Sequence, residues 1–141
     1  MIVGTGVDLA EIGRVARALD SPHGARFASR VFTEGERRYC DSRGRGRVES
    51  YAARFAAKEA VMKALGVGWG KNAGWRDIEV VRARGQAPQV ALSGPAAATA
   101  RRRGIERLSL ALSHAAGLAV AFVVAEGGEP AAGPASGASS G

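Results

Sequence analysis

The 141-residue chain has a single cysteine, Cys40, and few aromatic residues, which make up 6% of the sequence. One cysteine excludes a disulfide within the chain and a cysteine-based zinc site, so a reducing, cytoplasmic setting is expected. The scarcity of aromatics argues against a stacking platform for single-stranded nucleic acid. No apolar run approaches the ~20 residues of a membrane span, and the N-terminal segment with Asp8 and Glu11 does not resemble a signal peptide. The sequence therefore predicts no membrane partner.

Acidic residues are also few compared with basic ones. The chain has 20 Lys and Arg against 13 Asp and Glu, which gives a net charge of +7. The excess is concentrated in residues 12 to 47, which contain nine arginines and only four acidic residues. This charge fits a solubilising surface, a docking face for an acidic protein, or a basic nucleic-acid-binding domain without catalysis.

The order of predicted elements indicates the fold class. Apolar periodicity and turn residues predict helices over 9–19, 25–31, 33–40, 49–65 and 94–103, and strands over 2–7, 77–84, 89–92, 107–113 and 118–124. The strand pairs separated by short turns predict hairpins. We therefore expect a single α+β domain over residues 1–126, with a small antiparallel sheet packed with helices. Residues 127–141 are rich in Gly, Ala, Pro and Ser and are predicted to be a disordered tail.

The helix predicted over 49–65, ESYAARFAAKEAVMKAL, carries charged residues among alanines. Glu59 and Lys63 are four residues apart and share one face, while Arg54 and Lys58 share another. The Glu59–Lys63 spacing alone also fits a solvated surface pair worth ~0.2–0.5 kcal/mol. Asp8 falls at a predicted strand-to-helix junction, where it is either a helix N-cap or a metal-binding carboxylate.

Three sequence blocks occur in a set order: GTGVDL at 4–9, followed by Glu11 and Arg14, ARFAAKEAVMKA at 53–64, and LSH at 112–114. Together they closely resemble the holo-acyl carrier protein synthases, the small group of the 4′-phosphopantetheinyl transferase superfamily. The segments Phe32-Thr33 with Glu36 and Tyr39, and Gly66-Val67-Gly68, are similar as well. The likeness covers about residues 1–126 and leaves out the tail.

The resemblance implies a reaction and its cofactor. The 4′-phosphopantetheine group of coenzyme A would pass to a serine of an apo acyl carrier protein, of fatty acid or polyketide synthesis, leaving adenosine 3′,5′-bisphosphate. Members of the family use Mg²⁺ and are commonly trimers with the site between neighbouring subunits. The resemblance assigns Asp8 and Glu59 to the metal, and it implies no nucleic-acid or membrane partner.

The remaining site residues follow from the same resemblance. Lys63 would lie on the diphosphate, and Lys58 would either do the same or help to activate the serine. Arg54 and His114 would contact the 3′-phosphate or adenosine end of coenzyme A, and a histidine at a strand end can also be purely structural. Gly66 and Gly68 would let the backbone approach the nucleotide. The acidic carrier protein would dock on Arg14, Arg17, Arg26 and Arg30.

Overall fold

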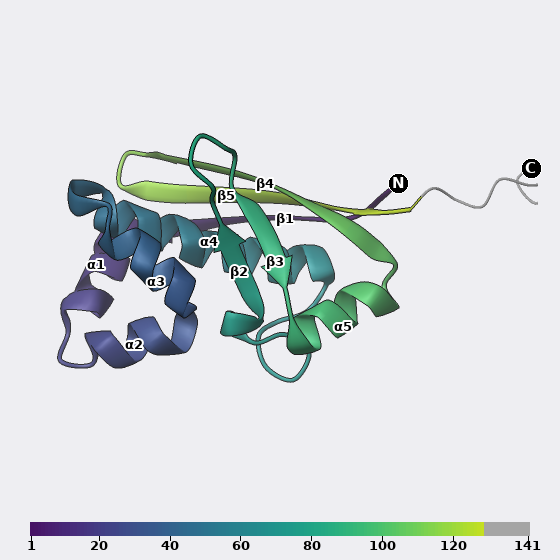
Figure 1. The fold of residues 1–141 in the computed structure, drawn as a ribbon, viewed down its shortest axis with the longest axis horizontal. Helices are drawn as coiled ribbons and strands as arrows, with labels where there is room; N and C mark the ends of the chain where they lie inside the picture. Colours follow the sequence, from purple (N-terminus) through teal and green to yellow (C-terminus); the bar gives the residue numbers. More distant parts are fainter. Residues whose placement is uncertain (129–141) are drawn as a thin grey trace, which may run out of the picture.

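The computed structural model describes residues 1–128, and its longest strands form one antiparallel sheet (Figure 1). The strands are β1 (Ile2–Glu11), β4 (Ile105–Ala115) and β5 (Leu118–Gly127), in the spatial order β1-β5-β4. The β4–β5 hairpin turns through Ala116 and Gly117, whose φ angles are 54° and 78°. Two successive positive φ angles match the twist of the flanking strands, so they suit a two-residue hairpin.

The helix α4 (Arg47–Leu65) lies along one face of this sheet, and glycine and alanine let the two backbones approach closely. A Cβ atom on Gly6 would lie 1.9 Å from the Ala60 carbonyl oxygen, and one on Gly4 would lie 2.4 Å from that of Ala64. Alanines of β5, such as Ala121, are buried beneath the same helix face. The core is therefore thin, and it fixes β1 closely against α4.

Shorter elements pack around this helix, on the same side of the sheet (Figure 1). Three helices gather at one end: α1 (Ile12–Asp20), α2 (Gly24–Val31) and α3 (Glu34–Asp41). A second hairpin, β2 (Ile78–Val81) with β3 (Gln89–Leu92), precedes α5 (Gly94–Arg102). Two short 3₁₀ turns complete the order, η1 (Gly44–Gly46) and η2 (Trp75–Asp77). No helix within residues 1–128 has the length and hydropathy needed to cross a membrane.

The α+β class is confirmed, and the strand boundaries differ from those predicted. β1 extends to Glu11, which pairs with Leu118 of β5, so α1 begins only at Ile12. Asp8 is therefore inside a strand, and the N-cap alternative is wrong: long-range pairing with β5 extends the strand beyond its apolar segment. Of the predicted tail, Gly127 ends β5, where its N–H donates to the Met1 carbonyl oxygen at 2.8 Å. Residues 129–141 lie outside the described residues.

Candidate active site

Asp8, Glu59 and Lys63 meet where the inner face of β1 crosses α4. Lys63 Nζ donates hydrogen bonds to Asp8 Oδ1 at 2.8 Å and to the Val7 carbonyl oxygen at 3.0 Å. Glu59 lies one helical turn before Lys63 on the same face of α4, close enough to Asp8 for the Asp8 charge to act on its carboxyl. The structure thus joins two carboxylates and an ammonium group that are far apart in the sequence.

The charges of this cluster shift the ionisation of Glu59 and Lys63. Burial, followed by the negative charge of Asp8, raises the pKa of Glu59, and the positive charge of Lys63 only partly opposes this shift. The hydrogen bond to Asp8 and its charge raise the pKa of Lys63, which remains a cation. One ammonium group therefore does not neutralise the two carboxylates, and the cluster favours a further positive charge.

The composition of this cluster fits a Mg²⁺ ion. Mg²⁺ prefers oxygen ligands, is held by one or two carboxylates, and keeps several waters or substrate oxygens. Within the described part of the chain, no group of three or more His, Cys, Asp or Glu side chains is arranged to hold a metal. Asp8 and Glu59 would thus supply two ligands and leave the remaining positions to water and substrate.

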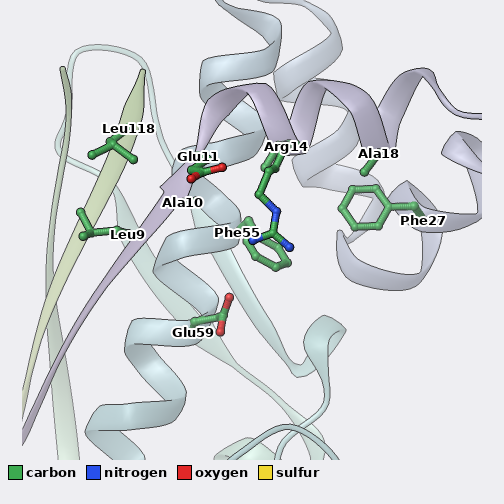
Figure 2. Close-up of a pocket in the computed structure, with 10 residues that line it drawn as sticks. Leu9, Ala10, Glu11, Arg14, Ala18, Phe27, Phe55, Glu59 and Leu118 are labelled. Carbon is green, nitrogen blue, oxygen red and sulfur yellow. The ribbon is translucent and has the colours of Figure 1, made fainter. Parts of the chain in front are cut away.

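A cavity of ≈ 570 Å³ opens beside Glu59 (Figure 2). The Arg14 guanidinium of α1 and the Glu59 carboxylate both point into it. Its apolar wall includes Phe27 of α2, Phe55 of α4 and Leu118 of β5. The cavity therefore combines an apolar surface with one cation, Arg14, and with the carboxylates of Glu11 and Glu59.

A second cavity, of ≈ 450 Å³, is lined by both Arg54 and His114. Arg54 is only 3% exposed, and its guanidinium carbon lies 4.3 Å from the centre of the Tyr39 ring. Its Nε has no hydrogen-bond partner among the described residues. A buried guanidinium with an unused donor suits a phosphate group, whose oxygens accept in the same plane.

Sequence reasoning missed three other arginines in this second cavity. They come from the loop before α4 and from the end of β2, namely Arg43, Arg45 and Arg82. The Arg/Gly composition of residues 42–47 was the one available signal for the first two. Nothing in the sequence connects Arg82 with that loop, because only the β2–β3 hairpin brings it there.

The two cavities belong to opposite edges of the sheet. Asp8 lies on β1 and His114 on β4, with β5 between them. Glu59 and Arg54 are five residues apart on α4, which places them about 140° apart around the helix axis. Within one chain, the structure therefore does not bring the carboxylate pair together with Arg54 and His114.

Lys58 lies at neither cavity. Its side chain is fully buried, and its Nζ donates to Glu36 Oε1 at 2.7 Å, to the Trp75 carbonyl oxygen at 3.0 Å and to the Ile78 carbonyl oxygen. Burial lowers the pKa of Lys58, and the charge of Glu36 opposes this shift. The structure places this predicted catalytic lysine in the protein interior.

The other predicted residues are exposed. Gly66 ends α4 in the left-handed region at φ 77°, and Gly68 follows with open space around its Cα. The four arginines predicted to dock a partner lie exposed on α1 and α2, and within residues 1–128 none of them forms an ion pair: Arg14, Arg17, Arg26 and Arg30. Their positive charges are thus available for a partner.

Comparisons with known proteins give one consistent result. The family model described as 4′-phosphopantetheinyl transferase superfamily matches residues 4–123. The holo-[acyl-carrier-protein] synthase of Anaeromyxobacter sp. (strain K) is 50% identical over 132 residues, which cover 92% of this chain and 100% of the relative. The crystal structure of the synthase from Neisseria meningitidis superposes with a TM-score of 0.80 at 33% identity, covering 89% of this chain and 99% of that one. The Helicobacter pylori synthase, solved in complex with coenzyme A, gives a TM-score of 0.75 at 32% identity and covers 86% and 99%.

Proposed function

The chain belongs to the 4′-phosphopantetheinyl transferase superfamily, and on that premise we propose that it transfers the 4′-phosphopantetheine group of coenzyme A to a serine of an apo acyl carrier protein. The products are the holo carrier protein and adenosine 3′,5′-bisphosphate. The observation that carries this proposal is the meeting of Asp8 and Glu59 beside Lys63. A basic nucleic-acid-binding domain would account for the net charge but has no use for a half-buried pair of carboxylates.

The chemistry of the transfer needs positioning and charge neutralisation more than covalent help from the protein. Asp8 and Glu59 would hold Mg²⁺, and the bound ion would supply charge neutralisation at the diphosphate of coenzyme A. Lys63 lies on the same diphosphate and offsets the charge that develops on the leaving phosphate. The serine oxygen forms the new bond to the pantetheine phosphorus and releases its proton. The bond from that phosphorus to the bridging oxygen breaks, and this oxygen leaves with adenosine 3′,5′-bisphosphate.

The nucleotide end of coenzyme A occupies the second cavity, on a neighbouring subunit. Arg54 and His114 contact its 3′-phosphate or adenosine, and Gly66 and Gly68 let the backbone approach the nucleotide. Because one chain presents its carboxylates and its phosphate-binding cavity at opposite sheet edges, a complete site needs two chains. The outer sheet face supports such an assembly, a homotrimer, because it exposes Val7, Leu9 and Phe122 by 53%, 57% and 46%.

The acceptor protein docks over the first cavity. Arg14 lines this cavity beside its apolar wall, and three more exposed arginines lie on the same two helices, α1 and α2. This combination fits an acidic protein with an apolar segment near its serine. An acidic carrier protein matches this surface, and the reaction takes place in the cytoplasm, where a lone thiol such as Cys40 stays reduced.

The proposal is tested by mass spectrometry of apo carrier proteins incubated with the chain, coenzyme A and Mg²⁺. We expect one added phosphopantetheine group on the serine of at least one acceptor, and no transfer in the presence of a chelator. Gel shifts with random DNA, measured alongside, test the basic-domain alternative. Absence of transfer to every acceptor, together with DNA binding, would contradict the proposed function.

A further inference from the structure

Lys58 has all of its hydrogen-bonding capacity committed inside the protein. An ammonium group has three N–H donors, and here they meet three acceptors: a carboxylate oxygen of Glu36 and the carbonyl oxygens of Trp75 and Ile78. The group is fully buried, so neither a phosphate nor a serine hydroxyl reaches it. Lys58 can therefore affect the reaction only through the groups to which it is hydrogen-bonded.

The Glu36 carboxylate accepts hydrogen bonds from three elements: α3, α4 and β2. Its Oε1 also accepts from the Thr33 N–H at 2.9 Å, which completes the capping box at the start of α3. Its Oε2 accepts from the Val80 N–H of β2 at 2.7 Å. The Glu36–Lys58 pair therefore fixes the start of α3 and the η2–β2 segment against the middle of α4.

The segment held by Lys58 carries a ring that supports the first cavity. The Trp75 ring stacks on Phe55, with 5.3 Å between the ring centres and an angle of 18° between the planes. Phe55 in turn lines the cavity together with Arg14 and Glu59 (Figure 2). The Trp75 ring thus packs against Phe55, while the Trp75 carbonyl oxygen is bound by Lys58.

We propose that Lys58 is a positioning residue that acts through Trp75 on Phe55, and so sets the shape of the apolar wall on which the acceptor protein docks. This inference rests on the proposed function, because it takes the first cavity as the acceptor's. It gives Lys58 a role in acceptor binding, rather than in the chemistry at the diphosphate.

The kinetic test separates these roles. Trp75→Ala removes the ring and leaves the carbonyl oxygen that Lys58 binds, and Lys58→Met combined with Glu36→Gln removes the buried pair without leaving one charge alone. For both variants we expect the KM for apo carrier protein to rise about tenfold, with kcat and the KM for coenzyme A within about twofold of wild type. Lys71→Met removes an exposed lysine charge and is the matched control, with an unchanged acceptor KM.

A spectroscopic measurement reports on the ring itself. The chain has two tryptophans, so Trp69→Phe leaves Trp75 as the sole tryptophan, which is excited selectively at long wavelength. In that background, removing the Lys58–Glu36 pair is expected to shift the Trp75 emission to longer wavelength and to increase its quenching by acrylamide. Far-UV circular dichroism and thermal melting establish that the variant is folded.

Two results would overturn the inference. The first is an unchanged acceptor KM in Trp75→Ala. This result would refute the inference even if the Lys58 variant does not fold. The second is a folded Lys58 variant that loses kcat while its acceptor KM and Trp75 emission stay as in wild type, since that pattern marks a direct catalytic role. A wild-type chain without transferase activity would remove the proposed function instead, and direct titration of acceptor protein would still decide the role of Lys58.

Discussion

Replacing Gly6 with alanine tests the contact that brings β1 to α4. The new Cβ would lie 1.9 Å from the Ala60 carbonyl oxygen and 2.9 Å from its carbonyl carbon, far inside the 3.4 Å at which ordinary van der Waals contact begins. Both atoms belong to the helix backbone, so no side chain can rotate away. The strand itself must shift, and Asp8 is only two residues further along it.

The magnitude follows from the cost of overpacking. Forcing an extra carbon into a well-packed core costs about 1–3 kcal/mol, and a clash with backbone places Gly6→Ala at the upper end. A loss of about 3 kcal/mol in the free energy of unfolding lowers Tm by on the order of 10 °C in a domain of this size. Gly13→Ala is the matched control: in α1 the new Cβ meets only the end of the Arg17 side chain at 3.4 Å, so the same substitution should be neutral or stabilise by up to about 1 kcal/mol.

Urea unfolding of both variants measures this difference, and calorimetric titration with Mg²⁺ and coenzyme A measures the effect on the site. We expect Gly6→Ala to bind Mg²⁺ more weakly, because its shifted strand carries Asp8 away from Glu59. Wild-type stability in Gly6→Ala would refute the close backbone contact. A destabilised variant with unchanged Mg²⁺ affinity would refute the dependence of the carboxylate pair on that contact.

Three further predictions follow from the site. The pKa of Glu59 is raised in the folded chain, so ionising Glu59 lowers the free energy of unfolding at a pH above that pKa. This loss disappears below the ordinary pKa of 4.5, because Glu59 is then protonated in both the folded and the unfolded chain. Glu59→Gln should therefore raise Tm at neutral pH without metal, yet lower the transfer rate at least ~10²-fold; a fully active variant would contradict the metal role. Arg54→Lys should raise the KM for coenzyme A about tenfold and leave that for dephospho-coenzyme A nearly unchanged, since only the former carries the 3′-phosphate; equal effects would remove that assignment. The association rate with carrier protein, measured by stopped flow, should fall steeply between low and physiological salt, and a flat response would exclude docking on the arginines of α1 and α2.

The sequence predicted the elements better than their lengths. The 49–65 helix was recognisable because it lacks Pro and Gly, and the capping box at Thr33 and Glu36 is a local pattern that the structure confirms. The extension of β1 to Glu11 depends on pairing with β5, more than 100 residues later in the chain. Local secondary-structure propensity cannot predict such a long-range pairing.

The same dependence on long-range packing explains which site residues were predicted correctly. Asp8 and Glu59 stand in conspicuous motifs, and here they do lie together. Lys58 stands in the same motif, but its partner Glu36 faces it only after α3 packs against α4, so its burial could not be read from spacing. Arg82 was missed for a related reason, because it reaches the second cavity only through the β2–β3 hairpin.

The position of the two cavities at opposite sheet edges has a consequence for the proposed assembly. In the proposed trimer, the β1 edge of each chain faces the β4 edge of the next, so the contact is heterologous and a closed ring contains as many complete sites as chains. A single subunit would then contain every required side chain but would have no complete active site. Under this proposal, activity would be a property of the closed ring, and newly made chains would remain inactive until their concentration permits ring closure.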